Sequence, residues 1–96
     1  MGTLSSRPLF PTGRIVATPG ALRALERAGE DASQFLARHS VGDWGDIDPG
    51  DVGLNQEALQ TGARILSVYY LRSGQKLWII SEADRSATTL LLPQDY

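Results

Sequence analysis

Hydrophobic and polar positions along the last third of the chain follow a pattern that predicts β-strands. Two runs rich in β-branched and aromatic residues, Arg64–Leu71 and Lys76–Ser81, flank the polar segment 72–75, which is typical of a β-hairpin. A third run, Thr88–Leu92, ends at Pro93, which has no N–H to donate to a neighbouring strand. Because the connections are too short for crossovers, the three runs predict an antiparallel meander.

The run Lys76–Ser81 is apolar on both sides of the predicted strand. Leu77 and Ile79 lie on one side, and Trp78 and Ile80 lie on the other. Since successive side chains point to opposite faces of a sheet, we expect this strand to be central and covered on both faces or nearly so. In that position Trp78 contributes mainly buried area to the core.

The N-terminal part of the chain predicts an arm and a short strand. Residues Met1–Thr12 contain two prolines and predict an extended arm whose first residues fray while Leu9 and Phe10 dock on the core. The segment Gly13–Ala17 is a strand candidate, and the sequence does not decide whether it joins the main sheet. A single domain is expected over residues 13–96.

Three further segments have the apolar spacing of helices. They are Pro19–Ala28, Asp31–His39 and Asp51–Thr61. Thr18 is the predicted N-cap of the first helix and Gly29 its end, with Leu22 and Leu25 on the side that covers the sheet. The third carries Leu54, Ala58 and Leu59 at helical spacing.

Helices and strands are largely segregated along the chain, which favours an α+β fold over βαβ alternation. We expect two layers, with an antiparallel sheet of three to four strands packed against two to three N-terminal helices. The chain is expected to be a monomer or a homodimer, because Thr88–Leu92 either pairs across a dimer or is covered by the N-terminal arm.

Composition and charge narrow the classes of function. Of the 96 residues, 42% are hydrophobic and 21% are charged, an ordinary globular balance for one domain. The net charge of -2 provides no global positive field, so nucleic-acid binding is possible only at a local surface and is not favoured. With no cysteine and one histidine, the chain is expected to hold no cofactor and no zinc or thiolate metal site.

The chain also lacks the patterns of membrane insertion and secretion. Its purely apolar runs are far shorter than the roughly 20 residues that cross a bilayer. The start, MGTLSSRPLFPTG, has no apolar centre of a secretory signal. We therefore expect a cytoplasmic protein that does not enter a membrane.

The string RHSVGDWG contains the first candidate for acid–base chemistry. His39 titrates near neutral pH, and a carboxylate such as Asp43 would raise its basicity. The alternative is that His39 fills the end of an amphipathic helix and interacts with its dipole. Trp44 is interpreted as an anchor for the acidic loop, with ligand stacking as the alternative.

Two polar loops are candidate binding surfaces, since loops on a rigid scaffold often carry function. The first contains Asp43, Trp44 and Asp46. The second contains Glu82, Asp84, Arg85 and Ser86. The alternative for the second loop is a turn with surface ion pairs. The acidic spacing matches no calcium-binding loop.

The predicted hairpin also carries cations and tyrosines. Arg64, Arg72 and Lys76, with Tyr69 and Tyr70, are suited to a small phosphate-binding surface. Solvated strand ends are the alternative. No Walker loop, GxGxxG, GxSxG or HExxH motif is present, so no common nucleotide or hydrolase chemistry is indicated.

Three strings carry a resemblance to a known family. They are GRIVATPGAL, FLARHSVGDWGD and KLWIISEADRSATTLLLP. Together they resemble a family of small uncharacterised bacterial proteins labelled plasmid-related and sometimes labelled as a type I restriction subunit. The resemblance spans Leu9 to Tyr96, with Ser81 where Thr is expected. It implies a plasmid or mobile-element context and no particular activity.

The layout of helices followed by a meander is also similar to barnase- and RelE-like ribonucleases. Carried over by position, this similarity implies His39 as acid or base, Arg64 as the phosphate contact, and Tyr70 and Thr88 as supporting groups. It is an analogy of fold.

From these observations we expect an accessory protein of plasmids or mobile elements that binds an unknown protein partner. The alternative is a small metal-independent ribonuclease that uses His39 and Arg64.

Overall fold

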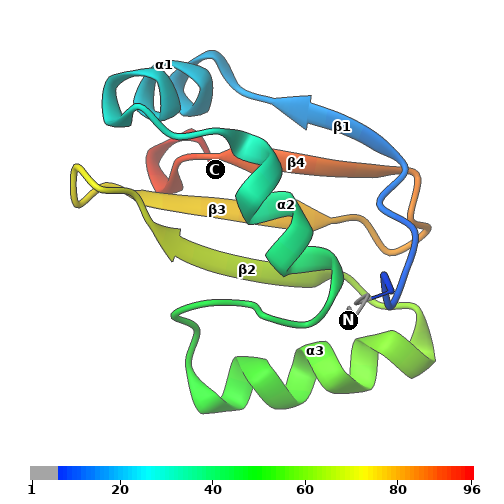
Figure 1. Ribbon diagram of the computed structural model, residues 1–96. Helices are drawn as coiled ribbons and strands as arrows, with labels where there is room; N and C mark the ends of the chain where they lie inside the picture. Colours follow the sequence, from blue (N-terminus) through cyan, green and yellow to red (C-terminus); the bar gives the residue numbers. More distant parts are fainter. Residues whose placement is uncertain (1–6) are drawn as a thin grey trace, which may run out of the picture.

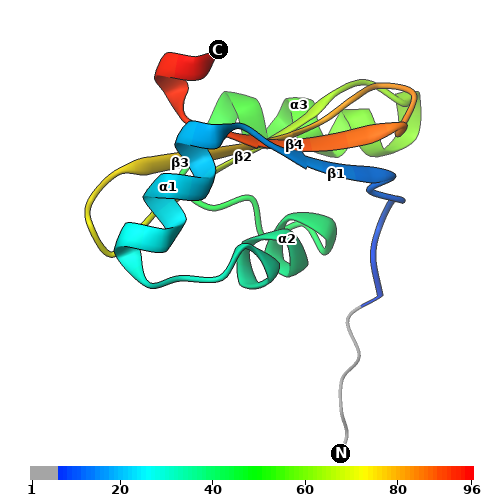
Figure 2. The same ribbon diagram turned by 90° about the horizontal axis from the view of Figure 1, so that it is seen from above.

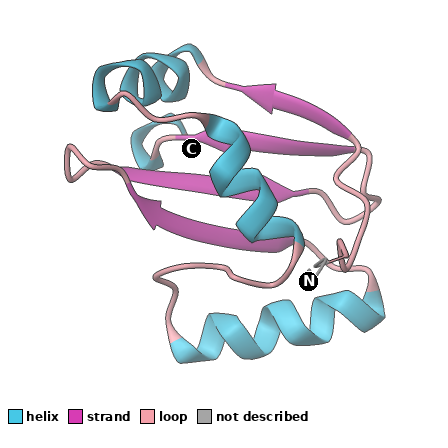
Figure 3. Ribbon diagram, in the orientation of Figure 1, coloured by secondary structure: helices cyan, strands magenta, loops and turns pink. Residues whose placement is uncertain are grey.

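The computed structural model describes residues 7–96, which form an α+β fold with the helices before most of the strands (Figures 1 and 3). The helices are α1 (Pro19–Ala28), α2 (Ala32–Ser40), α3 (Pro49–Thr61) and the short 3-10 helix η1 (Pro93–Asp95). The strands are β1 (Arg14–Ala17), β2 (Ile65–Tyr70), β3 (Lys76–Ser81) and β4 (Ala87–Leu91). The predicted fold class is confirmed.

The strands form one four-stranded sheet in the order β1-β4-β3-β2. The last three strands are the predicted antiparallel meander, with Trp78 opposite Val68 on β2 and Leu91 on β4. Strand β1, which the sequence left undecided, pairs in parallel with β4, with Ile15 opposite Thr88. The sheet is therefore mixed. The run Thr88–Leu92 is not an exposed edge, because β1 covers it.

Helices α1 and α2 cover one face of the sheet, whereas α3 lies along the β2 edge (Figures 1 and 2). The main core lies under α1 and α2, where Leu77, Ile79 and Leu90 are buried. A second cluster, in which Phe10, Trp44, Ala58 and Ile65 are buried, joins the N-terminal arm to α3. We call the opposite side of the sheet the aromatic face, after its residues Arg64, Tyr70, Lys76, Trp78 and Tyr96.

Local signals set the helix ends, and those of α1 are as predicted. The Thr18 hydroxyl accepts a hydrogen bond from the Ala21 N–H at 3.1 Å, and Gly29 ends α1 in the left-handed region with φ of 67°. The Asp31 carboxylate accepts from the Ser33 N–H at 3.1 Å and so begins α2. Each cap satisfies a backbone donor that the helix itself leaves without a partner.

Several predicted core residues lie elsewhere. Leu22 and Leu54 are exposed, because α1 packs through its alanine side and α3 meets only the edge of the sheet, so each buries a narrow stripe. In the arm Phe10 docks but Leu9 is exposed. Trp78 is only partly buried, since its face is not covered by α1 or α2. The predicted fraying of the first residues lies outside the described part.

No helix within residues 7–96 combines the length and the apolar character that a membrane span requires.

Candidate functional site

His39 lies at the centre of a buried polar network between α2 and the sheet. Its side chain is 0% exposed. Nδ1 lies 2.6 Å from the Ser67 hydroxyl on β2, and Nε2 lies 2.9 Å from the Ser81 hydroxyl on β3. Ser81 is linked in turn to Thr88 on β4 at 2.6 Å, and Thr88 donates to the Thr12 carbonyl at 2.8 Å. The network joins α2, three strands and the N-terminal arm.

Burial sets the protonation state of this histidine. Burial, together with the positive charge of the nearby Arg85 guanidinium, lowers the pKa of His39 from 6.5 to about 4. The Phe10 ring packs edge-on against the imidazole, with ring centroids 5.3 Å apart. His39 is therefore neutral at pH 7, and its two nitrogens are both engaged with hydroxyl groups rather than directed at solvent.

The residues that the ribonuclease analogy implies are not gathered at one cleft. His39 and Thr88 belong to the buried network. Arg64 and Tyr70 lie on the aromatic face, near opposite ends of β2 and thus about 20 Å apart along the strand. Acid–base cleavage requires the base and the phosphate contact to meet at one accessible site. Because His39 is buried and Arg64 lies on another face of the sheet, the geometry does not support the analogy.

The acidic loop after α2 is anchored to the β2 edge. Arg38 holds the Asp43 carboxylate through Nε at 2.7 Å and Nη2 at 3.1 Å, and these hydrogen bonds lower the pKa of Asp43. Trp44 is buried as an anchor. The Tyr69 hydroxyl donates to the Asp43 carbonyl at 2.7 Å, and burial raises the pKa of Tyr69 to about 12. Asp46, in the same loop, has an exposed side chain.

The second polar loop, between β3 and β4, is held by Arg85. Its guanidinium donates to the carbonyls of Ala63 at 2.7 Å, Glu82 at 3.0 Å and Ala58 at 3.1 Å. Arg85 therefore connects the end of α3, the start of β2 and its own turn, instead of pairing with Glu82 or Asp84 as the alternative reading expected.

The remaining members of this loop stay at the surface. The Asp84 carboxylate accepts a hydrogen bond from the Ser86 N–H at 3.0 Å, and hydrogen bonding with the side chain and then the backbone of Ser86 lowers the pKa of Asp84. Glu82 and Ser86 are exposed. The loop lies at the end of the sheet where β2 begins, whereas the Asp43–Asp46 loop lies along the β2 edge (Figure 1). The two loops do not form one binding surface.

The predicted phosphate-binding set is also divided. Tyr69 is buried under α2, and Arg72 makes an ion pair with Glu30 at 3.3 Å. Arg64, Tyr70 and Lys76 all lie on the aromatic face, with Tyr70 and Lys76 paired at one end of β2 and Arg64 at the other end.

The two edges of the sheet differ in a way that the sequence did not reveal. At the β2 edge the Asn55 side chain accepts from the Leu66 N–H at 3.1 Å and donates to the Leu66 carbonyl at 2.7 Å. Two residues along β2, the Val68 N–H donates to the Trp44 carbonyl at 3.0 Å, and the Val68 carbonyl accepts from the Asp46 N–H at 2.7 Å. The outward-facing backbone groups of Leu66 and Val68 are thus satisfied, and this edge is closed over them.

The β1 edge is open. The amides of Arg14 and Thr18 donate to Ser86 and Leu90 in or next to β4, both at 3.0 Å. Because bonding alternates along a strand, the N–H and C=O groups of Ile15 and Ala17 face away from the sheet. No described element lies along the outer side of β1 in Figure 1. Ile15 is 46% exposed, so a partner strand has access to this edge.

An apolar groove of about 470 Å³ lies beside the open edge, on the side of α2. Its lining includes Ile15 of β1, Leu36 and Ala37 of α2, and Phe10 and Pro11 of the N-terminal arm. We call this the β1 groove. Its lining would be difficult to deduce from the sequence, because it joins residues of the arm, β1 and α2 that lie between Pro8 and Ser40.

Residues 7–96 contain no group of three or more His, Cys, Asp or Glu side chains that could hold a metal ion. Comparisons of the chain with protein-family models, with curated proteins and with solved structures find no match. A function is therefore proposed from the geometry.

Proposed function

We propose that this protein is a small protein-binding module that takes an extended segment of a partner protein as a fifth strand beside β1. The observation that carries this proposal is the difference between the two edges, one closed by Asn55 and the acidic loop, the other open. Unprotected edges are templates for strand addition, and folded proteins usually block those that they do not use.

The β1 groove adds selectivity to such binding. Main-chain hydrogen bonds to Ile15 and Ala17 would provide affinity for any extended segment. Alternate side chains of that segment would lie above Ile15, toward Leu36 and Phe10, since side chains alternate between faces. We therefore propose a partner segment with apolar residues at every second position.

The biological setting remains the one that the family resemblance implies. We place the module in the bacterial cytoplasm as an accessory protein of plasmids or other mobile elements. No cysteine is present in the sequence, which accords with a reducing compartment.

A peptide-display selection tests the proposal directly. Random peptides long enough to form one strand are selected on the full chain, and enriched sequences are measured by fluorescence anisotropy. Wild type should enrich peptides with alternating apolar residues. The variant Ile15→Pro should lose this binding, because proline removes an N–H that points away from β4 and leaves the pairing with β4 intact.

Matched variants separate the backbone from the groove. Ile15→Thr keeps the amide and should weaken binding only partly, whereas Ala37→Glu places a charge at the groove and should weaken binding of apolar peptides. Thermal denaturation checks that each variant is folded. The proposal is overturned if no peptide is enriched, or if folded Ile15→Pro binds the enriched peptides as wild type does.

A further inference from the structure

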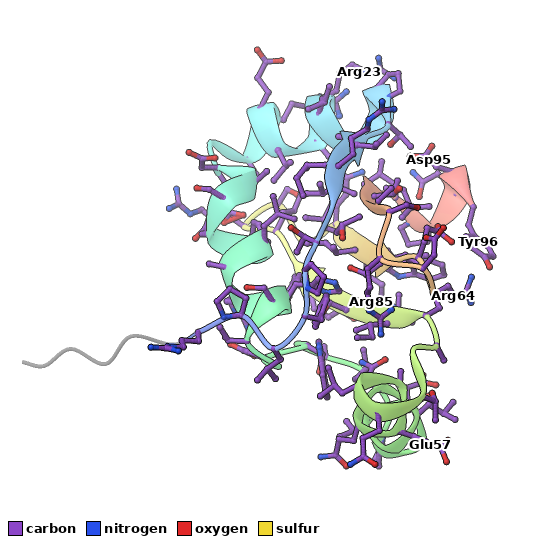
Figure 4. The ribbon with its side chains drawn as sticks, turned by 90° about the vertical axis from the view of Figure 1, so that its right-hand side faces the viewer. Arg23, Glu57, Arg64, Arg85, Asp95 and Tyr96 are labelled. Atoms are coloured by element: carbon purple, nitrogen blue, oxygen red, sulfur yellow. The ribbon has the colours of Figure 1, made fainter. Side chains whose placement is uncertain are left out.

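The aromatic face carries aromatic and cationic side chains that are accessible to solvent. Tyr70 is 50% exposed and Tyr96 is 71% exposed, and Trp78 is partly exposed beneath Tyr96. Arg64 and Lys76 are exposed beside them. In Figure 4, Arg64 and Tyr96 lie on the side of the sheet away from α2. This face is distinct from the open edge of β1, at the opposite side of the sheet from the β1 groove.

The aromatic rings form a short row across β2 and β3. The Trp78 and Tyr96 ring centroids are 5.7 Å apart in an edge-to-face arrangement. Tyr70 is paired with Lys76, and Val68 with Trp78, so Tyr70 and Trp78 are diagonal neighbours on one face, about 7–8 Å apart. The row therefore runs from Tyr70 through Trp78 to Tyr96.

A cation stands at each end of this row. The Lys76 ammonium lies 5.8 Å from the centre of the Tyr70 ring. The Arg64 guanidinium donates to the Tyr96 hydroxyl at 2.9 Å and lies 5.9 Å from the centre of that ring. Each end thus combines a flat π-surface with a positive charge.

These two cations have no carboxylate partner among the described residues. The ion pairs within residues 7–96 are Arg38 with Asp43 and Arg72 with Glu30. Asp95, the acidic residue nearest to Tyr96 in the chain, is engaged with the Thr18 hydroxyl at 2.6 Å and the Leu92 N–H at 3.0 Å. The positive charges of Arg64 and Lys76 are therefore available to an anionic ligand.

We infer that the aromatic face binds single-stranded nucleic acid, with bases stacked on Tyr70 and Tyr96 and phosphates contacted by Lys76 and Arg64. A ligand that presents flat bases and a regular series of negative charges matches both halves of this surface. Sheet faces that carry aromatic side chains stack bases in the same manner in RNA-binding domains. This inference does not depend on the proposed strand addition at β1.

The overall charge defines the expected strength of binding. With a net charge of -2, the molecule as a whole repels a polyanion, so the local surface should bind weakly and with strong salt dependence. Each cation that contacts a phosphate contributes about one unit to the salt slope, and two such contacts give a slope of about two.

Fluorescence anisotropy with labelled oligonucleotides tests the inference. Oligothymidylate and oligouridylate of about eight nucleotides, a length within the usual site size, are titrated with the full chain at low and moderate salt. Wild type should bind one or both. Tyr70→Ala should weaken binding about five-fold or more, the effect of losing one stacked base. Lys76→Gln should reduce the salt slope by about one.

Arg27→Gln is the matched control, because it removes one exposed cation from α1, outside the aromatic face. It should leave the salt slope unchanged. The inference is overturned if neither oligonucleotide binds at low salt, if folded Tyr70→Ala and Lys76→Gln bind as wild type does, or if Arg27→Gln weakens binding as much as Lys76→Gln. The variant Ile15→Pro, which is expected to lose peptide binding, should bind the oligonucleotides as wild type does. This result separates the test of the aromatic face from the test of the β1 edge.

Discussion

Individual residues in this chain carry roles that their side-chain chemistry alone does not distinguish. His39 has a side chain that could act as a catalytic base, but its environment is that of a core residue, since two hydroxyl groups and the Phe10 ring surround it. Arg85 resembles a surface charge in the sequence and instead donates to three backbone carbonyls. In both cases the hydrogen bonds that the side chain makes within the fold determine the role of the residue.

The buried histidine predicts a specific pH dependence of stability. Its pKa is lowered from 6.5 to about 4, so the folded state binds the proton less tightly than the unfolded state. The stability that neutral His39 contributes is fully present above pH 6.5 and is lost as the pH falls toward 4, by on the order of 3 kcal/mol. Urea denaturation of wild type between pH 7 and 4 measures this loss.

The control for this titration is His39→Gln, which is neutral at every pH and retains a donor and an acceptor. It should be less stable than wild type at pH 7 but nearly independent of pH between 6.5 and 4. The aspartates with lowered pKa, Asp43, Asp84 and Asp95, have an ordinary value of 3.8, so the stability that they contribute is lost mainly below pH 4. An equally steep decline in His39→Gln would contradict the assignment.

Glycine at position 45 is required by a close approach of two backbones. Gly45 has φ of 74°, and a Cβ there would collide with the Val68 carbonyl oxygen and the Tyr69 ring. We expect Gly45→Ala to destabilise the fold by about 2 kcal/mol or more. Gly53 lies inside α3 with open space around it, so Gly53→Ala should stabilise by about 0.5–1 kcal/mol. Chemical denaturation of both variants compares the two effects.

At the scale of elements, the sheet edges show how helices and loops can replace a missing strand. Helix α3 does not cover a face, and instead brings the Asn55 amide to Leu66, where it makes the two hydrogen bonds that a neighbouring strand would make. The acidic loop does the same for Val68 with its own backbone. Strand β1 has no such cover among the described residues, which is the basis of the proposed binding of a partner strand.

Removal of the Asn55 side chain should therefore reopen the β2 edge. Asn55→Ala leaves the partly buried N–H and C=O of Leu66 without partners, so we expect a loss of about 1–3 kcal/mol in the free energy of unfolding. It should also increase self-association, measured by light scattering, because the edge becomes available for pairing. Asn55→Asp keeps the acceptor for the Leu66 N–H but loses the donor, and is expected to fall between wild type and Asn55→Ala. A variant as stable as wild type would contradict this role.

The edges also predict a pattern of amide hydrogen exchange. The amides of Ile15 and Ala17 face outward from β1, whereas that of Val16 faces β4. Ile15 and Ala17 should exchange quickly and Val16 slowly, with the slowest exchange in β3 and β4 at the centre of the sheet. Binding of a partner strand should slow exchange at Ile15 and Ala17. Similar fast exchange at all three positions would indicate that β1 is not stably paired.

At the scale of the whole molecule, a single sheet separates two different surfaces. One face is covered by α1 and α2 and contains the main core. The other face of the sheet is the aromatic face, and the β1 edge lies between these two faces (Figure 2). A partner protein at β1 and a nucleic acid at the aromatic face would therefore occupy neighbouring but separate sites, so both could bind at once.

Much of the fold was predictable because its signals are local. The Thr18 and Asp31 caps, the Gly29 helix end, the hairpin break at 72–75 and the apolar run in β3 each depend on a few neighbouring residues. The candidate sites were less predictable. Trp44 was correctly interpreted as an anchor, but the lining of the β1 groove and the Asn55 contact depend on residues far apart in the chain.

The sequence by itself determined the α+β class, the meander and the burial of Leu77 and Ile79, because alternation and helical spacing are properties of a continuous segment. Only the tertiary structure decided that β1 pairs in parallel with β4, that His39 faces Ser67 and Ser81, and that Arg64 and Tyr70 share a face without His39. The physical reason is that these outcomes depend on which hydrogen bonds and apolar contacts remain available once helices and strands are packed together, and a linear pattern does not specify that choice.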